Sequence, residues 1–101
     1  MYYPDLSDID VSNITDMSEL FKIALSRISK PVKLDLRDWN MFNVTNMSEM
    51  FCRCKSLKEL DLTGWDTSSI TNMQDMFYGC MLLKYLYIFG WDTSKVYDNW
   101  Y

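Results

Sequence analysis

Three cysteines are the residues of this chain whose type could support nucleophilic or metal chemistry. Cys52 and Cys54 are separated by one residue, and Cys80 follows Cys54 after 26 residues (80 − 54). Three thiolates can ligate zinc, but the chain has no histidine, the commonest general base and metal ligand. Because Cys54 and Cys80 occupy the same position of a repeated pattern, we interpret them as small buried apolar residues. We therefore expect no metal and no cofactor.

Acidic side chains offer a second kind of chemistry, because two neighbouring carboxylates can act as general acid and base. Asp61 and Asp66 lie close together in the sequence, and related aspartates recur along the chain. A catalytic pair is built once, whereas structural residues are reused in every repeat. The sequence therefore predicts a protein that is not an enzyme.

Aromatic side chains provide the clearest indication of binding chemistry. Tyr85, Tyr87 and Phe89 alternate with other residues, which places all three on one side of an expected strand. Exposed aromatic clusters mark interaction sites, because they supply a large contact area at a low entropic cost. The aromatic residues at the C-terminal end either extend this patch or fold over the domain as a hydrophobic cap. The predicted partner-binding residues are Tyr85, Tyr87, Phe89, Tyr97, Trp100, Tyr101, Glu59 and Asp61.

A repeat with a period of 26 residues must position these side chains. Residues 47–51 (Met-Ser-Glu-Met-Phe) recur as residues 73–77 (Met-Gln-Asp-Met-Phe), a shift of 26 (73 − 47). Trp39, Trp65 and Trp91 keep the same spacing (65 − 39 and 91 − 65). Self-similarity at such a period is the signature of a repeat architecture.

The first half of each copy has a helical period. In the second copy, apolar residues recur at three- and four-residue steps, which predicts one buried face of a short helix. These residues are Val44, Met47, Met50, Phe51 and Cys54. Asn46 with Glu49 has the form of a capping box, and the other copies carry similar pairs. The first copy has four extra residues around 22–30, which should lengthen its helix or bulge its loop.

The second half of each copy reads as a short strand. Leu60 and Leu62 alternate with polar residues, and residues 33–36 and 85–88 are their counterparts. One such strand cannot bury its face alone, but stacked copies form a parallel sheet opposite a row of helices. We expect Trp39 and its equivalents to plug the core after each strand.

The predicted fold class is α/β, a short leucine-rich-repeat solenoid with parallel strands on one face and short helices on the other. We expect a single domain over residues 1–101, with copies at roughly 10–39, 40–65 and 66–91 and a partial cap at 92–101.

The outward positions of the predicted strands change character along the stack, from charged to aromatic. In chain order they are Lys33, Asp35 and Arg37, then Glu59, Asp61 and Thr63, then Tyr85, Tyr87 and Phe89.

One run of residues resembles a known family. Leu-x-x-Leu-x-Leu-x-x-Trp-Asp-Thr-Ser-x-Ile-Thr-x-Met-x-x-Met-Phe, read from Leu57 to Phe77, is similar to the BspA-like family of bacterial leucine-rich repeats. The resemblance covers roughly residues 10 to 96. In that family the repeats commonly form arrays in bacterial surface proteins that bind host or matrix proteins, so the resemblance implies a binding role.

Composition narrows the class of partner. The chain has 101 residues and a net charge of −4, and its ten basic residues are scattered along the sequence. Nucleic-acid backbones are bound by clustered Lys and Arg, so we expect no nucleic-acid partner. No stretch approaches the roughly 18 apolar residues of a membrane helix, so we expect no membrane partner. The odd number of cysteines indicates a reducing compartment.

We therefore expect a module that binds another protein. A first alternative is a stoichiometric inhibitor, encoded by a phage or other mobile element, of a host or defence enzyme such as a CRISPR effector. A second alternative is a fragment of a bacterial surface adhesin array. The expected location is the cytoplasm of a bacterium, or of the infected host cell if the chain is phage-encoded, and the cell surface if it is part of a longer exported protein. The sequence also allows a homodimer through the C-terminal edge strand.

Overall fold

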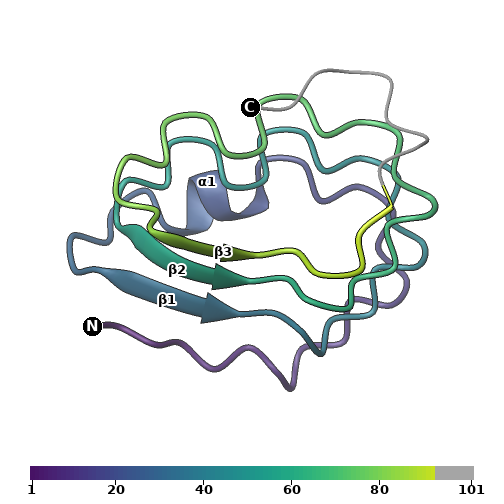
Figure 1. Ribbon diagram of the computed structural model, residues 1–101, viewed down its shortest axis with the longest axis horizontal. Helices are drawn as coiled ribbons and strands as arrows, with labels where there is room; N and C mark the ends of the chain where they lie inside the picture. The colour runs from purple at the N-terminus through teal and green to yellow at the C-terminus, as the bar shows by residue number, and fades with distance from the viewer. Residues whose placement is uncertain (93–101) are drawn as a thin grey trace.

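Three parallel strands form an open sheet along one side of the molecule (Figure 1). The computed structural model describes residues 1–92. β1 (Val32–Asp35), β2 (Leu57–Asp61) and β3 (Tyr85–Tyr87) lie side by side in chain order, and one short helix, α1 (Leu20–Ala24), lies across the molecule from them. The predicted α/β class and the parallel strand order are confirmed.

The register of the sheet aligns equivalent residues of successive copies. Leu34 pairs with Leu60, and Leu60 pairs with Leu86. Leu34 and Leu60 are fully buried, because side chains alternate between the two faces of a strand and this face covers the core. The register shifts once, between Val32 and Lys33 of β1.

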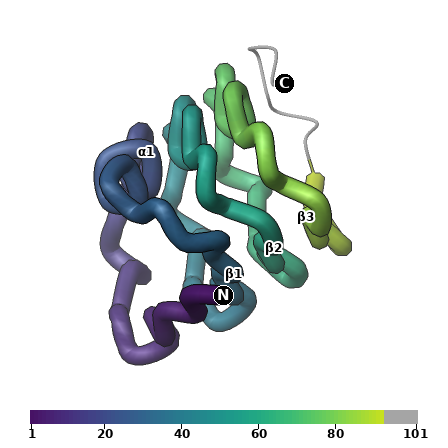
Figure 2. The backbone as a smooth tube through the Cα atoms, turned by 90° about the vertical axis from the view of Figure 1, so that its left-hand side faces the viewer, coloured from purple at the N-terminus to yellow at the C-terminus, as the bar shows by residue number. Residues whose placement is uncertain are grey.

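The predicted helices of the second and third copies are wrong, since these segments form consecutive turns (Figure 2). Alternate amides of the second copy donate to the third copy, and amides of the third copy such as Met76 donate to carbonyls three residues earlier. Neither pattern is the bond to the carbonyl four residues earlier that an α-helix requires. The hydrogen bonds run from Met47 to Asn72, Glu49 to Gln74, Phe51 to Met76 and Arg53 to Tyr78, at N–O distances of 2.9, 2.9, 3.0 and 2.6 Å. One N–H group cannot serve both patterns, so bonding between copies replaces bonding within a helix.

Left-handed backbone residues mark these turns. Glu49, Arg53 and Asp75 have φ angles of 56°, 58° and 54°, which interrupt any right-handed helix. The burial predicted for this half of the repeat is nevertheless confirmed. Val44, Met47, Met50, Phe51 and Cys54 are all buried.

The helix α1 occurs in the first copy, which carries the four extra residues. Its N-cap residue, Glu19, has a left-handed φ of 61° and makes no side-chain capping hydrogen bond. The predicted capping boxes are therefore wrong. Asn46 instead accepts a hydrogen bond from the Ser48 amide at 2.9 Å, and Asp16 does the same for Ser18. These short side-chain oxygens fold local turns, because they reach a backbone amide two residues on.

Aromatic side chains stack from copy to copy through the interior. Phe21, Phe51 and Phe77 form a ladder with centroid separations of 5.2 and 5.9 Å. Trp65 and Trp91 stack at 5.9 Å. The Trp65 indole N–H donates to the Leu36 carbonyl of the preceding copy at 2.7 Å. The predicted role of tryptophan as a core plug is confirmed.

The N-terminal segment extends the arrangement before the first copy. Tyr2 bridges to Val32 in parallel, and the Tyr2 carbonyl accepts a hydrogen bond from the Lys33 amide at 3.0 Å. Trp39 donates its indole N–H to the Leu6 carbonyl at 3.1 Å, as later tryptophans do one copy further on. Across residues 1–92, no helix has the length and hydropathy needed to cross a membrane.

Candidate partner-binding surface

The outward side of the sheet forms a continuous surface, called the strand face below. It is made by the side chains of Lys33, Asp35, Arg37, Glu59, Asp61, Thr63, Tyr85, Tyr87 and Phe89. The register aligns Lys33 with Glu59 and Glu59 with Tyr85, so that a row of the face contains one residue from each strand. The next row contains Asp35, Asp61 and Tyr87. The sequence-predicted change from charged to aromatic positions is thus a change across one surface.

Ion pairs connect the charged half of the strand face. Arg37 contacts Asp35 at 2.6 Å and Asp61 at 3.5 Å, and Lys33 contacts Glu59 at 3.5 Å. The hydrogen bond from Arg37 holds the pKa of Asp35 below its ordinary value, and the same bond raises the pKa of the Arg37 guanidinium. These pairs are partly exposed, so each contributes at most about 1 kcal/mol to stability.

The aromatic half of the strand face is exposed. Tyr85, Tyr87 and Phe89 have 42%, 38% and 69% of their surface accessible, and Tyr87 stacks on Phe89 with a centroid separation of 6.4 Å. A partner that covers large exposed aromatic groups is stabilised on them by about 25 cal/mol per Å² of apolar surface buried. The strand register places these three residues beside Glu59 and Asp61, on the same face that the sequence pattern indicated.

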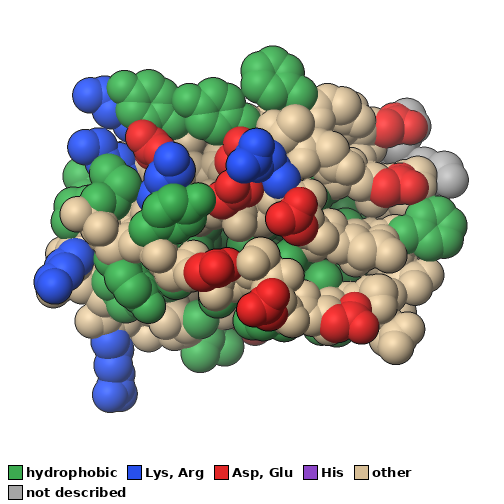
Figure 3. All heavy atoms as spheres, turned by 90° about the horizontal axis from the view of Figure 1, so that it is seen from below, with side chains coloured by type: hydrophobic (Ala, Val, Ile, Leu, Met, Phe, Trp, Pro, Cys, Tyr) green, Lys and Arg blue, Asp and Glu red, His purple; other side chains and the backbone are tan. Residues whose placement is uncertain are grey.

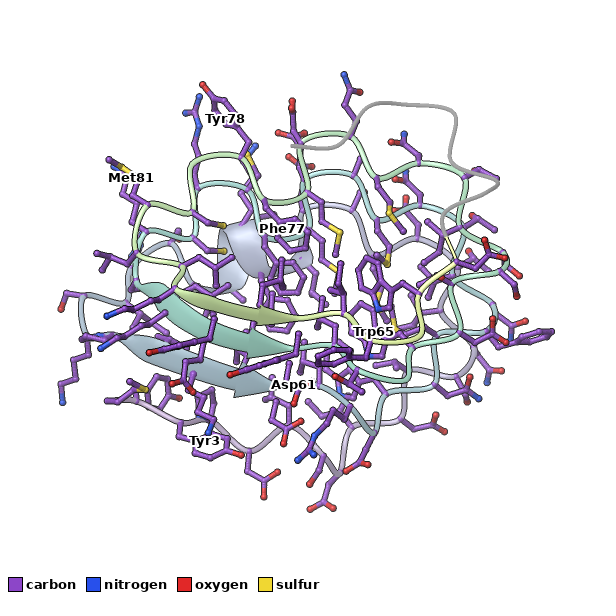
Figure 4. The ribbon with its side chains drawn as sticks, viewed as in Figure 1. Tyr3, Asp61, Trp65, Phe77, Tyr78 and Met81 are labelled. Carbon is purple, nitrogen blue, oxygen red and sulfur yellow. The ribbon has the colours of Figure 1, made fainter. Side chains whose placement is uncertain are left out.

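Sequence reasoning missed a further member of the surface, Tyr3. The Lys33 ammonium lies 5.3 Å from the centroid of the Tyr3 ring, a cation–π distance. Figure 4 shows Tyr3 and Asp61 on the lower side of the sheet, away from Trp65 in the interior. The spacing of the first copy could have indicated that Tyr3 belongs to this surface. Tyr3 precedes Lys33 by 30 residues (33 − 3), the same separation as that between Phe21 and Phe51 (51 − 21).

A shallow hollow of about 190 Å³ opens at the centre of the strand face. It is lined by charged residues of β1 and β2 and flanked by Tyr3 and Tyr87. Ionic groups therefore lie in the middle of the strand face, with aromatic rings on both sides. The three remaining predicted binding residues, Tyr97, Trp100 and Tyr101, lie outside the described residues.

Comparison with known families decides where the chain belongs. The model of the family described as "Mycoplasma protein of unknown function, DUF285" matches residues 2–100. The chain belongs to this family. No curated protein and no solved structure matches it. The DUF285 match spans all three copies and also includes Tyr3, so the strand face lies entirely within the family region.

The thiols of this DUF285 chain lie in the packed interior or at its border. The Cys54 thiol donates to the Phe21 carbonyl at 3.4 Å, and the Cys80 thiol donates to the Phe51 carbonyl at 2.9 Å. Burial raises the pKa of Cys54 to about 12 and that of Cys80 to about 11, so both are protonated at neutral pH. Within residues 1–92, no group of three His, Cys, Asp or Glu side chains is placed to hold a metal ion.

Basic residues that are scattered along the sequence gather toward one end of the fold. The segments 22–33, 53–58 and 78–85 contain no Asp or Glu, and they lead into the starts of the three strands. They hold eight of the ten basic residues, which together define the basic end: Lys22, Arg27, Lys30, Lys33, Arg53, Lys55, Lys58 and Lys84. Figure 3 shows most of the visible Lys and Arg atoms toward the left, where the strands begin, and Asp and Glu toward the middle and right. A chain of net charge −4 therefore has one cationic end.

Proposed function

We propose that this DUF285 protein is a BspA-like leucine-rich-repeat solenoid that binds another protein and catalyses no reaction. Hydrogen bonds between copies support the solenoid, since they recur at equivalent positions on both sides of the molecule. On the sheet side the Leu36 amide donates to the Asp61 carbonyl at 3.0 Å, and the Leu62 amide donates to the Tyr87 carbonyl at 2.8 Å. On the turn side, isolated bridges join Asp16 to Asn46 and Asn46 to Asn72. Such stacking presents one side of every strand to solvent.

The strand face is the proposed contact surface. The observation that carries this proposal is the exposed aromatic column of Tyr85, Tyr87 and Phe89 directly beside the ionic rows of β1 and β2. Interfaces concentrate their binding energy in a few aromatic and arginine side chains, with polar groups around them. We expect the partner to place apolar side chains against Phe89 and polar groups against Asp61.

The test is a strand-face variant in which Tyr85, Tyr87 and Phe89 are all replaced by Ser. These side chains cover no buried core, so the far-ultraviolet circular dichroism and the melting temperature should stay close to those of the wild type. Partners captured by the wild-type chain under reversible crosslinking should be lost from the variant, as measured by quantitative mass spectrometry.

A matched control separates this surface from general stickiness. Phe42 is 54% exposed and belongs to none of the three strands, so Phe42→Ser removes a comparable apolar group outside the strand face. The control should retain every specific partner. Equal partner sets for the wild type, the control and the triple variant would place the binding site away from the strand face.

Self-association is a second candidate, and one observation favours it. β3 pairs with β2 on one side, and no described strand pairs with its other side. An open strand edge offers backbone donors and acceptors to another chain. Light scattering over a range of protein concentrations tests this candidate, and a monomer at every concentration contradicts it.

A further inference from the structure

The basic end contains a solvent-facing hollow of about 520 Å³. It lies between the connecting segments of the first two copies and reaches one residue of the third. The lining residues are Lys22, Leu25, Ser26, Ile28, Ser29, Arg53, Lys55, Ser56 and Leu82. The lining thus combines three cations, three hydroxyl groups and three apolar side chains, and it includes no carboxylate.

Two of the three cations are available to an anion. Lys22 contacts Glu49 at 2.9 Å and Glu19 at 3.4 Å, which neutralises much of its charge. Arg53 and Lys55 are exposed and form no ion pair with any described residue. The Arg53 guanidinium lies 6.0 Å from the centroid of the Tyr78 ring, a contact that leaves its N–H groups available. The hollow therefore carries a net positive charge from Arg53 and Lys55, although Arg53 also lies within electrostatic range of Glu49.

A buried hydroxyl points to a ligand independently of the charges. Ser56 is 5% exposed, and its Oγ is the one buried side-chain N or O atom in the described residues without a hydrogen-bond partner. Native proteins pair nearly all such groups. The repeat does not require a hydroxyl here, because the equivalent residue of the third copy is Leu82, 26 positions later (82 − 56). The Val32 amide donates to the Ser56 carbonyl at 2.7 Å and fixes the residue beside the hollow.

We infer that this hollow binds the phosphate group of a phosphomonoester. A phosphomonoester carries nearly two negative charges at neutral pH, which complement the positive charges of Arg53 and Lys55. The arginine fork donates to two phosphate oxygens, and the lysine ammonium pairs with the same group. Ser56 lines the same hollow, and its unpaired hydroxyl is the further donor in this assignment. The apolar lining contacts the organic part of the ligand.

Two substitutions in the full chain test the site with phenyl phosphate as the probe, using chemical shifts of backbone amides. Saturable shifts should appear at Arg53, Lys55 and Ser56. Arg53→Gln should weaken binding by about tenfold, because it removes a charge-assisted pair. Ser56→Ala should weaken binding by about fivefold without lowering the melting temperature, because the hydroxyl has no protein partner to lose. That combination separates loss of the site from loss of the fold.

Lys84→Gln is the matched control, since it removes the same charge from the basic end but outside the hollow. It should change the affinity by less than about twofold, because exposed charges at a distance are screened by salt. Equal weakening by Lys84→Gln and Arg53→Gln would overturn the proposal in favour of diffuse attraction. Absence of saturable shifts, or full affinity in Ser56→Ala, would also overturn it.

The phosphomonoester has two sources, a free metabolite or a lipid headgroup. Two parallel measurements distinguish them. The phenyl phosphate titration is the arm for a free metabolite. Sedimentation with vesicles of phosphatidic acid in phosphatidylcholine, compared with vesicles of phosphatidylcholine alone, is the arm for a lipid headgroup. Binding that depends on Arg53 and Ser56 in either arm supports the site, and the arm of higher affinity identifies the source. If neither arm depends on both residues, the inference fails, and the strand-face proposal is unaffected.

Discussion

Replacing Asp75 by Gly should raise the free energy of unfolding. The same substitution would lower the free energy of unfolding if the third copy formed a helix. Asp75 has a φ of 54°, in the left-handed region that costs an L-residue about 1–2 kcal/mol. Gly relieves that strain but adds about 0.5–1 kcal/mol of chain entropy to the unfolded state. The difference is a net stabilisation of about 0–1.5 kcal/mol, and its midpoint of about 0.75 kcal/mol raises the melting temperature by about 3–6 °C for a domain of this size. In an α-helix, Asp→Gly costs about 0.3–0.5 kcal/mol instead.

Urea and thermal unfolding, followed by circular dichroism and tryptophan fluorescence, measure this difference. Gln74→Gly is the matched control, because Gln74 is exposed, adjacent in sequence and not among the residues with positive φ. It should destabilise the protein by about 0.5–1 kcal/mol. The two variants therefore move in opposite directions. If Asp75→Gly lowers the melting temperature as Gln74→Gly does, the left-handed turn and the bonding between copies that depends on it are refuted.

Three further predictions follow from the core, the ion pairs and the thiols. Trp65→Phe should lower the free energy of unfolding by about 2–4 kcal/mol, because it leaves the buried Leu36 carbonyl without its indole donor and removes ring contacts. Urea unfolding measures this change, and a loss below about 1 kcal/mol would contradict the prediction. The hydrogen bond from Arg37 lowers the pKa of Asp35, so its stabilisation is present above about pH 4 and is lost as the pH falls through the folded-state pKa. The stability difference between wild type and Asp35→Asn should therefore shrink below about pH 4, and a constant difference would contradict this. Burial raises the pKa of Cys54 to about 12, so this thiol should resist a disulfide reagent at pH 8 until the chain is unfolded, and rapid reaction of the native protein would be inconsistent with it.

Much of the fold could be predicted because the repeat encodes its own alignment. Trp39, Trp65 and Trp91 recur at equal spacing, and equal spacing with a leucine alternation requires equivalent strands in register. The burial of Met47 and Phe51 followed from the same periodicity and is confirmed. Tyr85 and Tyr87 could be placed on the outward face for the same reason, since side chains alternate along a strand.

The secondary structure of the turn side could not be predicted from one copy alone. Apolar residues at three- and four-residue steps bury one face of a helix and equally bury one face of a series of turns. The choice depends on where the amides of Met47 and Glu49 donate, and a neighbouring copy offers them carbonyls at 2.9 Å. That alternative exists only once the copies are packed side by side.

The sequence by itself determined the period, the inward residues, the parallel strands and the chemistry of the strand face, because each is a local pattern repeated along the chain. The tertiary structure alone decided what lies together across copies. It placed Tyr3 beside Lys33, gathered dispersed cations into one end, and left the Ser56 hydroxyl buried beside Arg53 and Lys55. The physical reason is that charge and hydrogen bonding act through space, so residues about 26 to 30 positions apart become neighbours only when successive copies stack.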